Sequence, residues 1–409
     1  MDAKQVTAAS SNALVVAGGG LVGALTALLV ARAQPDHEIV VVEPQPDGPA
    51  PDPRTIALAA GTVRVLEGLG VWTSLATQAC PIQHIHVSDR HHLGATRLHA
   101  EQEGVAALGQ VIAASELNQA LYNACQSQQN IQWMGDHRVV ATAATRAERT
   151  VTLESGAGDT VSMTCQLLVG ADGNKSAVRA ALDIPVVSTH YDQQGIIAVL
   201  QLADGLNGWA YERFTPYGPV ALLPMPNRQA SLVWSMPPDE AEATMNLPAA
   251  EFVRAAQHAF GFRAGRFTDV TMRTQYPLQL HLAERSVAHR AVLIGNASHS
   301  LHPIAGQGFN LGVRDALSLA AVLSKSTSDK TDFGSYNVLS DYWQSRTQDY
   351  DRTIGLTDLL VRGFSSSAFP LTYGRTLALG ILDWMPPLRA AFARQTMGLN
   401  NPVVGRGEH

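Results

Sequence analysis

One short stretch near the start of the chain constrains the fold more than any other. Residues 13–17 (ALVVA) read as a buried strand, and Gly18, Gly20 and Gly23 follow at once as a G-x-G-x-x-G turn. An apolar helix rich in Ala and Leu then runs to about Ala33. Strand, glycine turn and helix in this order are typical of the first half of a βαβ unit.

Each part of this unit suits the binding of a dinucleotide. The glycines allow a tight turn and a close approach of the backbone to a pyrophosphate, whose charge the helix N-terminus attracts. A second strand, 38–43, ends in Glu43, about twenty residues after the glycine turn, where a carboxylate accepts hydrogen bonds from ribose hydroxyls. An acidic rather than a basic residue at this point favours FAD or NAD over NADP.

The remaining pattern divides the chain. Buried strands of the first type return at 167–171 and 291–295, whereas 185–284 alternates between short strands and Pro or Gly. We therefore expect a disordered leader at 1–12, a nucleotide-binding domain from 13–80, 110–184 and 285–340, a mainly antiparallel substrate-binding sheet domain from 81–109 and 185–284, and a helical C-terminal region at 341–409.

Composition and charge exclude several classes of protein. The net charge is −6 and the chain has no Lys/Arg block, so no nucleic-acid partner is expected. Three widely spaced cysteines predict neither a disulfide framework nor a zinc site, and His84 and His86 have no further ligand at metal spacing, so no metal is expected. Without a signal-peptide pattern or an uninterrupted apolar stretch of about 18 residues, the chain is expected in the cytoplasm, with attachment to a membrane surface left open.

Two later segments resemble motifs of a known family. GADGNKSAVR (170–179) resembles the Asp-Gly motif of the flavoprotein aromatic hydroxylases, with Asp172 and Gly173 at its centre. VLIGNASHSLHPIAGQGFNLGVRDA (292–316) resembles the second FAD fingerprint of the same family. The resemblance implies an α/β protein of the para-hydroxybenzoate-hydroxylase type, with a Rossmann-like FAD-binding domain of the glutathione-reductase type, an interleaved sheet domain over the ring, and a helical tail.

The second fingerprint also has a physical explanation. A helix that begins at Gly306, Gln307 and Gly308 offers free backbone N–H groups and the positive end of its dipole to the negative edge of a reduced flavin. Pro303 fixes a turn beside the ring. Asn310 has two alternative roles: a bond to the flavin edge, or a cap on the loop.

One position departs from the family pattern. The chain has Gly295-Asn296 where most of these enzymes have Gly-Asp, whose carboxylate accepts a hydrogen bond from the ribityl chain of the flavin. The amide oxygen of Asn296 can still accept a bond, but without the help of a charge. The substitution therefore bears on the affinity for FAD.

Three further residues are assigned by resemblance or by chemistry. Arg54 resembles the arginine that reaches the flavin after the ribose-binding strand, and Gln110 resembles a flavin-contacting glutamine at the start of a helix. A phenol is most reactive at its para carbon as a phenolate, so a nearby acceptor helps the reaction. His302, next to Pro303, is the candidate, with a purely structural bond to the loop as the alternative.

The longest shared segments resemble the ubiquinone-biosynthesis branch of the family. They are DPRTIALAAGTVRVLEGLGVW, HVSDR, ERFTPYGPVALLPMP and GNASHSLHPIAGQGFNLGVRDALSLA, and the 2-polyprenyl-6-methoxyphenol hydroxylases resemble them most. This resemblance implies hydroxylation of a prenylated phenol to the 1,4-benzoquinol, with FAD as cofactor, NAD(P)H as reductant and O2 as co-substrate, through a flavin C4a-hydroperoxide.

Two alternatives stay open at this point. One is a sibling hydroxylase acting at another ring carbon, and the other is a non-catalytic flavin-binding subunit among other ubiquinone-biosynthesis proteins. The apolar tail, 364–398, fits contact with a membrane, with such a partner, or with its own protein equally well.

Overall fold

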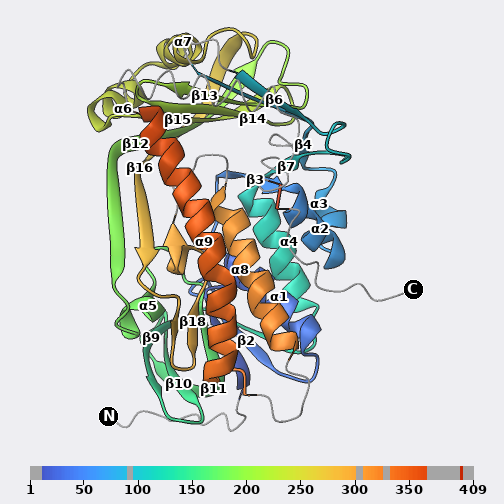
Figure 1. The fold of residues 1–409 in the computed structure, drawn as a ribbon, viewed down its shortest axis with the longest axis vertical. Helices are drawn as coiled ribbons and strands as arrows, with labels where there is room; N and C mark the ends of the chain where they lie inside the picture. Colours follow the sequence, from blue (N-terminus) through green and yellow to red (C-terminus); the bar gives the residue numbers. More distant parts are fainter. Residues whose placement is uncertain (1–11, 90–94, 301–306, 326–331, 366–396, 399–409) are drawn as a thin grey trace.

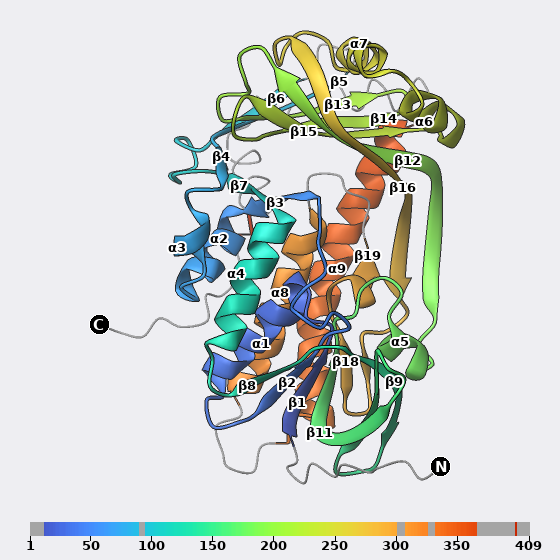
Figure 2. The ribbon, with the colours of Figure 1, turned by 180° about the vertical axis from the view of Figure 1, so that it is seen from behind.

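The computed structural model describes residues 12–89, 95–300, 307–325, 332–365 and 397–398. It contains two eight-stranded sheets, a three-stranded sheet, and helices that connect them (Figures 1 and 2). The predicted leader lies outside the described residues except for Asn12, where the first strand begins. None of the described helices is both long enough and apolar enough to cross a bilayer.

The first sheet has a parallel centre that forms around the N-terminal strand. Strand β1 pairs in parallel with β11 on one side and with β2 on the other. Leu14 and Val16 pack into the core under the helices, whereas Val15 and Ala17 pack into the core of the opposite face, because successive strand residues point to opposite faces. The parallel strands are β18 (Ala291–Leu293), β11 (Thr160–Gly170), β1 (Asn12–Ala17), β2 (Ile39–Val42) and β8 (Ile131–Met134).

Both faces of this sheet are covered. Helices α1 (Leu21–Ala33), α4 (Ala114–Gln126) and α8 (Gln307–Ser324) lie on one face, as Figure 1 shows. Toward the other face, β9 (His137–Ala144) and β10 (Arg149–Ser155) extend β11 as an antiparallel part of the sheet. The short helix α5 (Ala177–Ala181) follows β11, and the edge strand β17 (Val287–Ala288) pairs with β18.

The second sheet stands at the other end of the molecule. Two strands of 17 residues each, β12 (Val186–Leu202) and β16 (Phe267–Ala283), reach from beside the first sheet into it (Figures 1 and 2). Helices α6 (Pro238–Met245) and α7 (Ala249–Phe260) pack on its outer face. Its other strands are β5 (His84–Asp89), β6 (Ala95–His99), β13 (Trp209–Thr215), β14 (Gly218–Pro224), β15 (Gln229–Met236) and β19 (His299–Ser300).

A small sheet lies between the two large ones. Strand β7 (Gly109–Ala113) pairs with β3 (Thr55–Ala59) and β4 (Cys80–Ile82), and α2 (Ala60–Gly68) and α3 (Trp72–Leu75) follow β3. Met397 is buried against this region and its carbonyl accepts a bond from Gly61 N at 2.9 Å. Residues 397–398 therefore pack on their own protein, while 366–396 lie outside the described part of the chain.

A buried carboxylate joins the two C-terminal helices to the strands. Asp315 of α8 accepts bonds from Arg346 Nε at 2.8 Å and Tyr350 Oη at 2.8 Å, both on α9 (Tyr336–Ser365), and from His299 Nε2 at 2.6 Å. Burial by itself raises the pKa of this carboxyl, but the charges of His299 and Arg346 outweigh that effect and lower the pKa to about 2.

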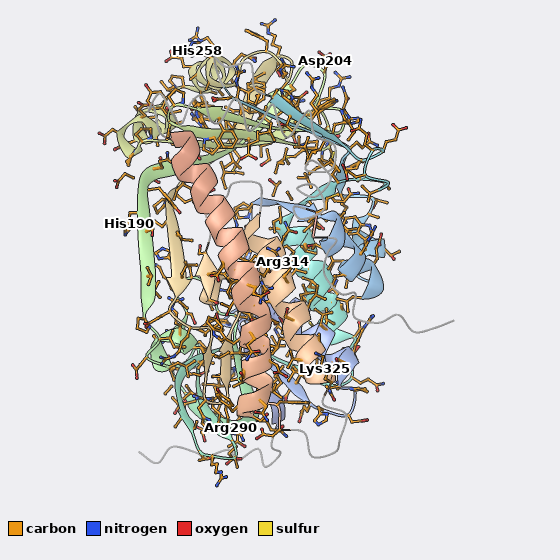
Figure 3. All side chains as sticks on the ribbon, in the orientation of Figure 1. His190, Asp204, His258, Arg290, Arg314 and Lys325 are labelled. Carbon is orange, nitrogen blue, oxygen red and sulfur yellow. The ribbon has the colours of Figure 1, made fainter. Side chains whose placement is uncertain are left out.

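A second ion pair lies nearby between the same helices. Arg314, labelled in Figure 3 where α8 faces α9, pairs with Asp349 at 3.1 Å. Charged side chains with little exposure to water thus attach α9 to α8. Away from water, such ion pairs are strong only if every charged group has its partner.

We expect Asp315→Asn to lower the free energy of unfolding by about 3–5 kcal/mol, because it leaves buried positive charge without its partner. The lowered pKa of Asp315 means that its contribution to stability is complete above about pH 4, the unfolded value, and is lost as the pH falls through about 2. Urea unfolding from pH 7 to pH 2 measures both effects. The stability difference between wild type and variant should shrink below pH 4, and a difference that stays constant to pH 2 would contradict this account.

Candidate functional site

The three motifs found in the sequence meet at the carboxyl end of the parallel strands. Ala171 N donates to Ala17 O at 2.8 Å, and Ile294 N donates to Gly170 O at 2.9 Å, so the turns after β1, β11 and β18 lie side by side. Arg179 Nη1 then donates to Ala297 O at 2.8 Å, which joins the second motif to the third. Segments about 280 residues apart in the chain therefore form one surface at the place where open α/β sheets bind ligands.

The glycines of the first motif form a cradle that larger side chains would fill. Gly18 has a φ of +98°, and a Cβ on it would lie 2.6 Å from Ala171 O. A Cβ on Gly23 would lie 1.9 Å from Gly18 O, so this glycine is needed for the packing of helix on turn. Gly20, in contrast, faces open space, with no atom within 4 Å of an added Cβ.

The start of α1 lies beside that open space. Its N-cap is Gly20, which has no side-chain cap bond, and the first turn of the helix has no acidic residue. The free N–H groups and the positive end of the dipole are therefore left for an external anion. These features fit the pyrophosphate of a dinucleotide.

Glu43 lies at the carboxyl end of β2, next to the cradle. It is buried, and its two oxygens accept bonds from Gly19 N at 2.8 Å and Gln45 N at 3.1 Å. Burial raises its pKa, and the two N–H bonds offset part of that increase. A carboxylate oxygen can accept more than one bond, so each oxygen can also receive a ribose hydroxyl, the role predicted from the sequence.

A pocket of about 410 Å³ opens between these motifs and β9. Its size is in the range of small-molecule sites. Gly18 and Asp172 of the two motifs line it together with Arg138, which pairs with Glu154, and Lys175. The lining residues are Ala17, Gly18, Val42, Pro44, Arg138, Val139, Val140, Asp172, Lys175 and Ala177.

The Asp-Gly motif is held by its own polar side chains. Asp172 accepts bonds from Ser176 Oγ at 2.5 Å and Val178 N at 3.0 Å, and Ser176 caps α5 by accepting a bond from Arg179 N at 2.9 Å. Gly173 follows with a φ of +81°. In this structure Asp172 shapes the loop beside the pocket; a direct contact with the cofactor stays a prediction.

Contacts with α8 and α1 hold the turn of the second fingerprint in place. Gly295 has a φ of +56° and its N–H donates to Asp315 Oδ2 at 2.9 Å, while a Cβ on it would lie 3.1 Å from Val22 of α1. Asn296, the departure from the family pattern, is exposed on the 3-10 turn Gly295–Ala297. The turn thus presents Asn296 beside the start of α1, and its bond to the ribityl chain stays a prediction.

Asn310 bonds to the protein itself. Its Oδ1 accepts bonds from Ala59 N at 2.9 Å and Thr62 Oγ1 at 2.8 Å, and its Nδ2 donates to Ala57 O at 3.0 Å. Of the two roles considered from the sequence, these contacts favour the structural one. The residue attaches the start of α8 to the corner between β3 and α2.

The structure describes only some of the remaining predicted residues. His302, Pro303 and Gly306 lie outside the described residues. Helix α8 begins at Gln307, as predicted, and an added Cβ on Gly308 would meet no atom within 4 Å.

Two residues differ from the expectation in their local structure. Gln110 was expected at the start of a helix, but it lies inside β7, paired with Leu58 and Pro81, because the strand continues to Ala113. The exposed guanidinium of Arg54 makes two bonds to Asp52, at 2.8 and 2.6 Å. A contact of Arg54 with the flavin stays a prediction. For such a contact, the N–H groups that bond to Asp52 must also bond to the flavin or leave Asp52 for it.

Sequence reasoning missed the residues that hold the second fingerprint in place. His299, three residues before His302, is fully buried and bonds to Asp315. The signal was present in the sequence, since Asp315 stands directly before the mainly apolar second half of its helix, ALSLAAVL. Its partners Arg346 and Tyr350 lie too far along the chain to be matched to it by spacing.

Comparison with known proteins gives a consistent result. The model of the family described as "FAD binding domain" matches residues 11–350. Ubiquinone hydroxylase UbiL of Rhodospirillum rubrum is 33% identical over 94% of this chain and 89% of its own. The 3-demethoxyubiquinol 3-hydroxylase of Escherichia coli is 30% identical over 94% of this chain and 98% of its own.

A solved structure shares the fold. The p-nitrophenol 4-monooxygenase PnpA from Pseudomonas putida superposes with a TM-score of 0.78 over 96% of this chain and 99% of its own, at 18% identity. The predicted fold class, a nucleotide-binding α/β domain with an interleaved sheet domain, is confirmed.

The cradle yields a matched pair of substitutions. We expect Gly20→Ala to leave the apoprotein folded, because the added methyl group meets no protein atom, and to weaken FAD binding at least about tenfold, because the methyl group occupies the path of the pyrophosphate. Gly23→Ala should instead lower the melting temperature of the apoprotein, since its Cβ overlaps Gly18 O. Flavin titration and thermal unfolding measure the two effects, and full flavin affinity in Gly20→Ala would exclude this placement of the pyrophosphate.

Proposed function

Because this chain belongs to the FAD-dependent hydroxylase family of ubiquinone biosynthesis, we propose that it hydroxylates a 2-polyprenyl-6-methoxyphenol to the corresponding 1,4-benzoquinol. The FAD cofactor and the monooxygenase class predicted from the sequence are confirmed by the family match and the relatives. The meeting of three fingerprint turns at one end of the parallel sheet is the observation that carries the proposal.

The chain positions the reactants and excludes water. The start of α1 and the open side of Gly20 would hold the pyrophosphate, and Glu43 the ribose. When bound, FAD supplies the transfer of electrons from NAD(P)H and the activation of O2. The second sheet, which faces the flavin domain across β3, shields the reacting ring from solvent.

A sibling reaction at another ring carbon is the second candidate. It is supported by the Escherichia coli relative, whose name places its hydroxylation at carbon 3 of a demethoxyubiquinol. The two candidates share the flavin site and differ in the ring that is bound and in which of its carbons faces the flavin. The product therefore distinguishes them.

We also propose a location in the cytoplasm and work beside other proteins of the same pathway. The location is supported by the thiols of Cys80, Cys125 and Cys165, which are all free and of which two are buried. A polyprenyl substrate is a reason for the enzyme to work near a membrane surface, whichever of the three roles the tail plays.

We expect the purified FAD-loaded protein, given NAD(P)H, labelled ¹⁸O2 and a methoxyphenol with a short prenyl chain, to place one labelled oxygen para to the hydroxyl. Mass spectrometry and NMR of the product give the label and its position. Label at another carbon would favour the sibling reaction, and a colourless protein that does not take up flavin would refute both.

A further inference from the structure

The second sheet presents Glu212 of β13 on the face that looks toward the flavin domain, and the strand register places Asp89 of β5 on the same face. Tyr211 and Arg213 of β13 point outward: the Tyr211 ring packs edge-on against Phe260 of α7 at 5.7 Å, and the Arg213 guanidinium donates to Phe260 O. Because strand residues alternate between faces, Glu212 between them points inward. It is a single carboxylate between two outward-facing residues.

The residues directly opposite Glu212 in the neighbouring strands are apolar, whereas Asp89 lies diagonally across from it on β5. The partners of Glu212 in the flanking strands are Val87 of β5 and Ala221 of β14, and Val233 of β15 follows in the same row. An apolar row of this kind suits an aromatic ring and a prenyl chain. Glu212 would be the polar group that orients them.

Two interactions show which part of the flavin domain lies opposite this face. Ser231, two residues from Val233 on β15, accepts a bond from Thr55 Oγ1 of β3 at 2.6 Å. Tyr276 of β16 lies close enough to Arg54 for the charge of the guanidinium to act on its hydroxyl. The inner face is therefore placed over residues 54–55, the segment that the family resemblance assigns to the flavin.

Glu212 has an oxygen available for a ligand. Its Oε1 is buried and has no hydrogen-bond partner in the described part of the chain. The side chain of Glu212 is half-buried. Unpaired buried carboxylate oxygens are costly and rare in folded proteins, so a missing hydrogen-bond donor is the simplest explanation.

We propose that Glu212 is a catalytic residue that accepts the phenolic O–H of the substrate and takes its proton during hydroxylation. This inference rests on the proposed function for the identity of the substrate. The phenolic proton passes to a Glu212 oxygen as electron density moves to the para carbon, where the new C–O bond forms. One oxygen atom of O2 enters the ring and the other leaves as water, with the two electrons from NAD(P)H and the protons of that water from NAD(P)H and solvent. The displaced ring proton goes to solvent, and Glu212 returns its proton to the product oxygen.

The acidity of the group suits this role. Burial raises the pKa of Glu212 to about 7, which places it where a general base is half-ionised near neutral pH. The other charged or titratable groups of described side chains around this face are Asp89 on β5, Arg54 and Tyr276. Helix α9 also packs against β13 and β14.

The first experiment follows the hydroxylation rate in Glu212→Gln. We expect a decrease of roughly 10²-fold or more at pH 7.5, with flavin content unchanged. The rate in wild type should rise with a midpoint near pH 7, and in the variant this rise should move toward the pKa of a free phenol, about 10. Glu240→Gln, which removes an exposed carboxylate from α6 of the same domain, is the matched control and should behave as wild type.

The second experiment does not depend on turnover. The probe 2-methoxy-4-nitrophenol changes colour on ionisation, and two negative charges within hydrogen-bond distance oppose each other. Bound to wild type, the probe should therefore ionise at least about one pH unit higher than when bound to Glu212→Gln. Equal midpoints in the two proteins, or a slow Glu240→Gln control, would overturn the assignment.

Thermal unfolding checks that Glu212→Gln is folded. A folded-state pKa of about 7, above the unfolded value of about 4.3, means that wild type loses stability as the pH rises from 4 to 7 and stays penalised above it. The variant should therefore melt higher than wild type at pH 8 and similarly at pH 4. If wild type fails to hydroxylate but the nitrophenol shift is present, the proposed substrate is wrong and the ring-binding role of Glu212 stands.

Discussion

The close approach of backbone to backbone around Gly18 is the constraint on which the rest of the structure depends. The turn after β1 touches the turn after β11 through Gly18 and Ala171, and it touches the turn after β18 through Val22 and Gly295. No side chain larger than hydrogen fits at Gly18 or Gly23 without displacing main-chain atoms. The nucleotide site is therefore a surface of peptide groups, and the side chains nearby mainly hold those groups in position.

Buried charged side chains hold these peptide groups in position. Asp315 accepts the Gly295 N–H at the same time as it binds His299, Arg346 and Tyr350. The interior of a protein makes such bonds strong and makes any missing partner costly. Helix α8, which begins more than 300 residues after the start of the chain, thereby fixes the shape of a turn in the flavin site, and α9, which bonds to Asp315, extends from there to the second sheet.

Local signals in the sequence were sufficient for much of this. The strand, glycine turn and helix at 13–33 and the start of α8 at Gln307 follow from patterns within a few residues. Gln110 was placed wrongly because β7 and α4 adjoin without a turn residue between them. Long-range pairings gave no local signal, so neither the partners of Asp315 nor the inward position of Glu212 could be derived before the sheet order was known.

The order of the strands has a consequence for biosynthesis. The central strand β1 is made first, yet it pairs with β11, and the cradle at its end is complete only when α8 and α9 are in place. At the usual rate of translation, residue 350 follows residue 18 by a time on the order of tens of seconds. During that interval the nascent glycine turn has no finished binding surface, so we expect flavin to be captured only after the residues through Tyr350 have left the ribosome.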